Sequence, residues 1–283
     1  MFLVIESGAS KLQWVLAHKG GVLREGLLPG LHPFLSSAAH WQQTLAQLCT
    51  DLALQSNVST YYYGTGCAQQ AGVDTVSAYF EQHAPLLYPL VVETDLLAAA
   101  RALCQDQPGI ACILGTGSNA GGYDGRQIVH QRGGLGFILG DEGSGAALGL
   151  LLLRAWLYGQ LSPSLTAWLA DHHRLSREHI ITHIYKGDNP SQYLASFAPV
   201  VHEWMEKDTG LYHQVVDHYQ LLVQNTLLPL HRLMGTHVVH FTGSVAVHFH
   251  PVINQVLRQH GLTPGIVEGS PMALLLDFHR NNI

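Results

Sequence analysis

One glycine-rich segment with an acidic pair, Gly133–Gly149 (GGLGFILGDEGSGAALG), holds the most distinctive set of chemically capable residues in the chain. Its seven glycines let the backbone approach a ligand closely. The pair Asp141-Glu142 precedes an apolar helix expected over Ala146–Trp156. Carboxylates just before a helix can cap its N-terminus or accept hydrogen bonds from a polyhydroxylated ligand. Taken alone, the segment is also compatible with a flexible loop before a capped helix.

Two other glycine turns, Glu6–Lys11 (ESGASK) and Gly115–Asn119 (GTGSN), offer backbone N–H groups and hydroxyls that suit phosphate oxygens. A carboxylate beside such a turn, here Glu6, can hold Mg²⁺ through water. Either turn alone is more often a plain hairpin. Neither fits the GxxxxGK[ST] spacing, so a P-loop is not predicted.

A carboxylate also follows the strand expected over Leu90–Val92. Asp95 in this position could take a proton from a sugar hydroxyl as that hydroxyl attacks a phosphoryl group. The simpler interpretation is that Asp95 is the N-cap of a helix over Leu96–Cys104. Both roles are compatible in one residue.

The elements that position these residues repeat along the chain. Three strands with a glycine turn between the first two are expected near the N-terminus and again in mid-chain, as duplicated domains that clasp a ligand would show. The segment from Gly140 to Met234 is predicted to be mostly helical. The predicted strands are Phe2–Ile5, Leu12–Ala17, Val22–Leu27, Thr60–Tyr63, Leu90–Val92, Ile110–Leu114, Ser118–Tyr123, Gln127–Gln131, Val238–Thr242 and Ile266-Val267, and the other predicted helices are Trp41–Leu54, Val73–Gln82, Val245–His260 and Pro271–Phe278.

The fold predicted from this order is α/β, with two domains and a boundary near Gln105–Gly109. The first domain is expected over residues 1–108, with a final helix in 271–283 that packs back on it. The second is expected over residues 109–270 and contains the helical insertion.

Composition narrows the function classes. A net charge of −6 gives no basic stripe for nucleic acid, and no apolar run reaches the length of a membrane span. The four cysteines are too widely spaced for a zinc or iron–sulfur motif, and reduced thiols fit a cytoplasmic protein. Nineteen histidines raise the question of metal binding, but the pairs His179/His183 and His248/His250 lack a third ligand.

Six segments together carry a resemblance that covers essentially the whole chain. Their order along the chain is the one seen in bacterial N-acetylglucosamine kinase-like proteins. The segments are ESGASKLQW, YYYGTGC, TDLLAAARALC, GIACILGTGSN, GGLGFILGDEGSGAALG and FTGSVAVHF. These resemble the sugar kinase/Hsp70/actin superfamily, in the group that also contains the dehydratase-activating ATPases. The resemblance implies two ribonuclease H-like (actin-like) domains with an interdomain cleft, and phosphorylation of an amino sugar, N-acetylglucosamine first, by ATP with Mg²⁺.

The resemblance also implies roles for individual residues. Asp95 is similar to the general base, and Glu6 to a residue that holds Mg²⁺ through water. Sugar contacts are implied for Asp95 and for His32, Ser118, Gly133, Gly134 and Asp141. ATP contacts are implied for Gly8, Ser10, Lys11, Gly115, Thr116, Gly117, Gly243 and Ser244, with Ala198 in the adenine pocket. The implied partner is a small-molecule sugar, with no nucleic acid and no membrane, and the apolar helical half allows a homodimer.

The chain departs from the family pattern at three of these places. Most of the superfamily has Asp and Thr where this chain has Glu6 and Ser10, and related proteins commonly read GxNPF where Gly30–Phe34 reads GLHPF. His32 offers a ring nitrogen where an amide offers both a donor and an acceptor. These departures keep open a non-catalytic sugar sensor. A dehydratase-activator ATPase is a further alternative, although only Cys67 lies beside a glycine turn.

Overall fold

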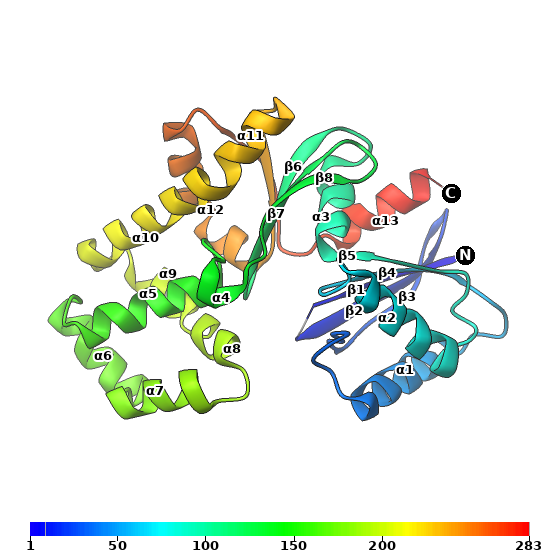
Figure 1. Cartoon of the computed structure of the whole chain (residues 1–283), viewed down its shortest axis with the longest axis horizontal. Coiled ribbons are helices and arrows are strands. Elements are labelled where there is room, and N and C mark those ends of the chain that lie inside the picture. Colours follow the sequence, from blue (N-terminus) through cyan, green and yellow to red (C-terminus); the bar gives the residue numbers. More distant parts are fainter. Residues whose placement is uncertain (9, 283) are drawn as a thin grey trace. The chain divides into compact units, whose positions relative to one another are not determined.

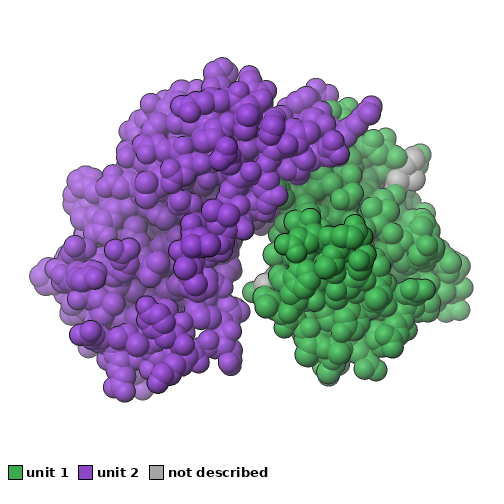
Figure 2. Space-filling view, viewed as in Figure 1, with its two compact units in different colours: residues 1–106, 271–283 green, residues 107–270 purple. Residues whose placement is uncertain are grey.

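The protein is built from two compact units, residues 1–106 with 271–283 (unit 1) and residues 107–270 (unit 2) (Figures 1 and 2). The computed structural model describes residues 1–8 and 10–282, so Ala9 of the predicted Glu6–Lys11 turn lies outside the described residues. The predicted domain boundary follows residue 108, and the division between the units follows residue 106.

Each unit contains one five-stranded sheet, and the two sheets share one strand order. The order is β3-β2-β1-β4-β5 in unit 1 and β8-β7-β6-β9-β10 in unit 2. In both sheets the first three strands are antiparallel neighbours, whereas the last two run parallel to the central strand. The shared order confirms the predicted mixed α/β fold with a repeated strand series.

Unit 1 sandwiches its sheet between two pairs of helices (Figure 1). Leu3 and Ile5 of the central strand face α1 and α2, whereas Phe2 and Val4 face α3 and α13. Because successive strand residues point to opposite faces, a strand covered on both faces must be apolar throughout, as Phe2–Ile5 is. Its elements are β1 (Phe2–Ser7), β2 (Lys11–His18), β3 (Gly21–Pro29), α1 (Ala38–Leu52), β4 (Ser59–Gly64), α2 (Gln70–His83), β5 (Leu90–Thr94), α3 (Asp95–Cys104) and α13 (Met272–Asn281).

Unit 2 is larger because a helical layer is inserted between its third and fourth strands. Buried side chains of the sheet, of α5 and of the later helices form one continuous apolar core. Its elements are β6 (Gly109–Leu114), β7 (Ser118–Tyr123), β8 (Ile128–Gly133), α4 (Gly136–Leu139), α5 (Gly145–Leu157), α6 (Pro163–His173), α7 (Arg177–Lys186), α8 (Pro190–Ala195), α9 (Ala198–Trp204), α10 (Thr209–Leu222), the π-helical turn η1 (Val223–Leu227), α11 (Leu228–Met234), β9 (Val238–Thr242), α12 (Ser244–Gln259) and β10 (Thr263–Glu268).

Two helix caps differ from the prediction. Thr94, not Asp95, is the N-cap of α3, and its hydroxyl accepts a hydrogen bond from the Leu97 amide at 3.1 Å. Ser144, not the acidic pair, is the N-cap of α5. In both places a second cap-forming residue lies close to the carboxylate in the sequence, so local propensity does not decide between them. The two carboxylates at Asp95 and Asp141 are therefore available for other contacts.

Candidate active site

The carboxyl ends of three parallel strands meet at one edge of the unit 1 sheet. Ser7 at the end of β1 pairs with Gly64 of β4, and Gly64 pairs with Thr94 of β5. Thr65 and Asp95, each one residue further on, therefore lie next to each other. In open sheets with parallel strands, ligands bind beyond these carboxyl ends.

Asp95 is held by a hydrogen bond on each carboxylate oxygen. The Thr65 hydroxyl donates to Oδ2 at 2.7 Å, and the Leu96 amide donates to Oδ1 at 2.8 Å. Burial raises the pKa of Asp95 above its usual value, while these two donors and the nearby His32 act to lower it. The result is an oriented, desolvated carboxylate with lone pairs left to accept a proton.

Glu6 lies on the same edge, at the end of β1. Burial raises the pKa of Glu6 to about 7, the Asp95 charge adds to the rise, and Lys11 opposes it. Two carboxylates that repel each other in a desolvated place suit an oxygen-liganding divalent cation, which relieves the repulsion. The residues present therefore fit Mg²⁺ at Glu6.

His32 extends toward this edge from the loop after β3. The Phe34 amide donates to its Nδ1 at 3.2 Å, so in the neutral ring the proton is on Nε2. A Cβ built on Gly66 would lie 3.1 Å from Nε2, which places the ring against the turn after β4. Burial lowers the pKa of His32, with the Asp95 charge opposing. His32 therefore offers one N–H donor near the Asp95 carboxylate.

The hairpin between β1 and β2 provides open backbone. The Gly8 amide donates to the Lys11 carbonyl at 2.9 Å, and a Cβ on Gly8 would meet only that oxygen, at 3.8 Å. Ser10 and Lys11 are exposed. Space of this kind beside a turn suits phosphate oxygens.

In unit 2, the turn between β6 and β7 lies against Gly243, which together with Ser244 was also predicted to contact ATP. A Cβ on Gly243 would collide with the Leu114 carbonyl, and this glycine has a φ of +112°, so only glycine fits there. Ser244 follows at the start of α12. A Cβ on Gly115 would meet nothing within 4 Å, which leaves a cradle open beside the backbone.

The N-terminus of α5 is already occupied by this turn. The Gly145 amide donates to the Gly115 carbonyl at 2.8 Å, and the Ala146 amide donates to the Thr116 carbonyl at 3.0 Å. These amides are the ones that a helix N-terminus would otherwise offer to an anion. The glycine-rich segment before α5 therefore supports the turn, and its own helix start is not a free phosphate site.

Asp141 is the centre of the other predicted cluster in unit 2. Its Oδ1 accepts a hydrogen bond from the Gly136 amide at 3.1 Å, and a Cβ on Gly117 would lie 2.8 Å from its Oδ2. Burial raises the pKa of Asp141, whereas backbone hydrogen bonds from Gly136 and Ser118 lower it. The Gly134 amide donates to the Ser118 carbonyl at 3.0 Å. The structure thus brings Gly117, Ser118, Gly134 and Asp141 together.

The remaining predicted residues lie as follows. Thr116 and Gly117 complete the β6–β7 turn, Gly133 ends β8 with a φ of +79°, and Ala198 is a buried residue at the start of α9. Ala198 thus belongs to the helical layer and not to either glycine turn. Thr65 holds Asp95, yet no role was predicted for it; its place directly after a strand that is parallel to β5 was the available signal.

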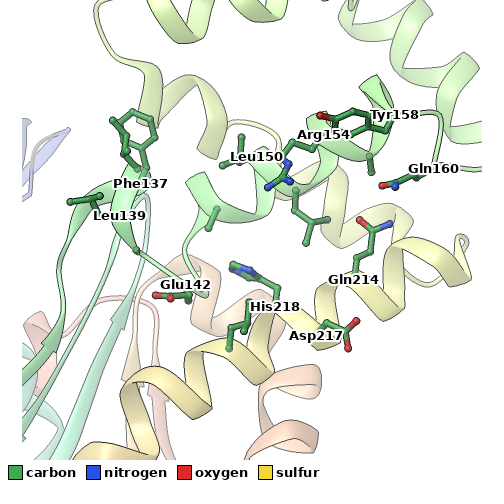
Figure 3. A pocket seen from close by; sticks show the side chains of 16 residues that line it. Phe137, Leu139, Glu142, Leu150, Arg154, Tyr158, Gln160, Gln214, Asp217 and His218 are labelled. Atoms are coloured by element: carbon green, nitrogen blue, oxygen red, sulfur yellow. The ribbon is translucent and has the colours of Figure 1, made fainter.

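A groove of about 760 Å³ lies between α4, α5 and α10 in unit 2 (Figure 3). Figure 3 shows His218 and Arg154 on facing helices, with Asp217 and Gln214 along the same helix as His218. The Gly143 amide donates to Nε2 of His218 at 2.8 Å, and burial lowers the pKa of His218 to about 4. No predicted site residue lines this groove, although Gly140 and Glu142, the two neighbours of Asp141 in the chain, are among its lining residues.

Three further features of the described residues concern metal-binding groups, thiols and membrane spans. Within residues 1–8 and 10–282, no group of three or more His, Cys, Asp or Glu is arranged to hold a metal ion. Cys67, Cys104 and Cys112 are buried, and burial raises the pKa of the Cys67 thiol to about 12, which disfavours the thiolate that a cluster needs. None of the described helices combines the length and apolarity needed to cross a bilayer.

Comparison with known proteins gives a family. A candidate N-acetylglucosamine kinase from Porphyromonas gingivalis is 34% identical, with 100% of this chain and 99% of that chain covered and a TM-score of 0.92. The chain belongs to the N-acetylglucosamine kinase-like family. No protein-family model and no curated protein sequence matches it.

More distant structures share the fold of this family. A candidate N-acetylglucosamine kinase from Chromobacterium violaceum is 20% identical, with 98% of this chain and 99% of that chain covered and a TM-score of 0.64. A ROK family glucokinase from Streptomyces griseus, in complex with glucose and AMPPNP, is 16% identical, with 98% and 97% covered and a TM-score of 0.55. These comparisons confirm the two-domain, actin-like sugar kinase fold.

Proposed function

We propose that the chain is an ATP-dependent kinase that phosphorylates an amino sugar, with N-acetylglucosamine at its 6-hydroxyl as the first candidate. The observation that carries the proposal is the oriented, desolvated carboxylate of Asp95 at the end of β5. Family membership supports it, because the similar proteins from P. gingivalis and C. violaceum are described as candidate N-acetylglucosamine kinases.

In the proposed reaction the oxygen of the sugar hydroxyl attacks the γ-phosphorus of ATP while Asp95 accepts the hydroxyl proton. The bond from the γ-phosphorus to the β,γ-bridging oxygen breaks, and ADP leaves. The Leu96 amide keeps the carboxylate oriented while the proton moves. Mg²⁺, when bound near Glu6, neutralises charge on the phosphate oxygens. The open backbone at Gly8 and Gly115 supports assignment of these turns to the phosphates, with Ser10, Lys11, Thr116 and Gly117 beside them.

Sugar contacts are proposed separately for His32 and for the residues of the Asp141 cluster. Nε2–H of His32 would donate to a sugar oxygen. Asp141 would accept from sugar hydroxyls, because the oxygens that bind backbone amides keep spare lone pairs. Ser118, Gly133 and Gly134 are also assigned to the sugar, and Gly243, Ser244 and Ala198 are assigned to the adenosine.

The test is a coupled ADP-release assay on the purified protein with N-acetylglucosamine, glucosamine, N-acetylmannosamine and glucose. The proposal expects ADP release that depends on Mg²⁺ and is fastest with an amino sugar. A sugar that binds tightly without ADP release would support the non-catalytic sensor instead. ADP release that no sugar stimulates would refute kinase activity and favour an ATPase.

A further inference from the structure

The Thr65 hydroxyl makes the shortest side-chain hydrogen bond at the proposed base. It donates to Asp95 Oδ2 at 2.7 Å, across the ends of the parallel strands β4 and β5. We infer, on the basis of the proposed function, that Thr65 is a positioning residue that fixes the Asp95 carboxylate in the orientation needed to accept the sugar proton.

The inference follows from the freedom that a carboxylate otherwise has. The terminal torsion of Asp is broad and roughly two-fold, so one hydrogen bond leaves the carboxylate able to swing. The Leu96 amide holds only Oδ1, and the Thr65 hydroxyl holds the other oxygen. Two donors on two oxygens stop the rotation and so fix the directions of the remaining lone pairs. A general base depends on a fixed orientation of its carboxylate, because a misplacement of the reacting groups by about 1 Å costs roughly 100-fold in rate.

Thr65 is itself held in place. Its amide donates to the Ser7 carbonyl at 3.1 Å, which ties it to the end of β1. Its side chain is β-branched and therefore stiff at χ1. The turn continues at Gly66 with a φ of +86°, and a Cβ there would press on Pro33 and His32. The Thr65 hydroxyl is therefore carried by a fixed backbone segment and lies within hydrogen-bond distance of Asp95.

The variants Thr65→Val and Thr65→Ser separate positioning from a structural role. Valine keeps the shape and removes the donor, whereas serine keeps the donor. Thr60→Val is the matched control, because Thr60 lies on β4, the strand that leads to Thr65, and its hydroxyl donates to the Val58 carbonyl instead, at 3.0 Å. Steady-state kinetics with the sugar that is fastest for the wild-type protein give kcat and KM, and thermal melting confirms that each variant is folded.

We expect Thr65→Val to lower kcat roughly 10- to 100-fold with the sugar KM within about two-fold, because the base acts in the transition state. Thr65→Ser should recover most of kcat, and Thr60→Val should match the wild-type kcat. The inference is wrong if Thr65→Val keeps the wild-type kcat, or if serine is as impaired as valine. It is also wrong if kcat is unchanged and only KM rises.

A second measurement keeps the inference distinct from the proposed function. The carboxyl ¹³C signal of Asp95, assigned by its loss in Asp95→Asn, should move in Thr65→Val and stay in place in Thr60→Val. If wild-type protein phosphorylates no sugar but this signal moves, the hydrogen bond exists and the proposed kinase function is refuted. If the protein is an active kinase and the signal does not move, Thr65 does not position the base.

Discussion

A buried histidine in unit 1 is expected to make the stability of this protein sensitive to acid. His279 of α13 has 3% of its surface exposed. Tyr63 Oη accepts a hydrogen bond from Arg101 at 2.8 Å, so its own proton is directed to His279 Nε2, which lies at 2.9 Å. A proton on Nε2 would remove this acceptor and set a second cation beside Arg101. Burial, with Arg101 adding to it, lowers the pKa of His279 from 6.5 to about 4.

The sign and size of the effect follow from these values. Above pH 6.5 neither the folded nor the unfolded chain carries the proton. As the pH falls below 6.5, the unfolded chain binds a proton that the folded chain binds only near pH 4, so the free energy of unfolding decreases. Between pH 7 and pH 5, His279 alone removes about 2 kcal/mol of stability. That is a large part of the ~5–15 kcal/mol that holds a typical domain folded.

The test is urea denaturation at pH 7 and pH 5 of the wild-type protein and of His279→Gln. Glutamine offers an amide oxygen to Tyr63 and does not titrate. The loss of unfolding free energy on acidification should therefore be about 2 kcal/mol smaller in the variant. Other buried histidines, such as His218, cancel in this difference. His213→Gln, at an exposed position, is the control and should behave as the wild type does. Equal acid losses in wild type and His279→Gln would refute the reasoning.

Three other changes test the proposed site and the fold. Asp95→Asn should lower kcat by roughly 10²- to 10⁴-fold while sugar binding measured by calorimetry is kept, since the amide cannot act as a base; near-wild-type turnover would remove Asp95 from the mechanism. His32→Ala should weaken sugar binding about 10-fold through loss of one donor and leave ATP binding unchanged; an equal loss for both ligands would contradict the assignment. Gly243→Ala should lower the melting temperature far more than Gly159→Ala, because both glycines have positive φ but only Gly243 would also collide with the Leu114 carbonyl; similar losses would show that the turn gives way.

Much of the fold was predictable because hydrophobic patterning repeats along the chain. The strand series starting at Phe2 and at Ile110 have the same arrangement in the two sheets, and each places a glycine turn between its first two strands. The strand at Ile266-Val267 was predicted too short, since Thr263–Glu268 pairs with β9 through a shift in register that sequence periodicity does not reveal. The one-turn helix α4 was missed for a related reason, because four residues carry no periodic signal.

The site was less accessible to prediction from sequence, because its contacts depend on pairing between distant strands. Asp95 stood out as a carboxylate after a strand, but which of Thr94 and Asp95 caps the helix is decided by geometry. Thr65 acquires its contact only through the β4–β5 register. Asp141 has a φ of +61° and accepts hydrogen bonds from two backbone amides, so it organises its own loop. For this reason Asp141→Asn, which keeps an oxygen acceptor, tests sugar binding better than Asp141→Ala.

In the proposed reaction, the γ-phosphate of ATP is transferred to the 6-hydroxyl of an amino sugar. The most direct measurement is ³¹P and ¹³C NMR of the product formed from Mg·ATP and N-acetylglucosamine by the wild-type protein, with Asp95→Asn beside it. We expect a sugar phosphate whose phosphorus couples to C6, formed together with ADP by the wild-type protein and absent with the variant. Inorganic phosphate as the only product, or a sugar phosphate formed equally by Asp95→Asn, would contradict it.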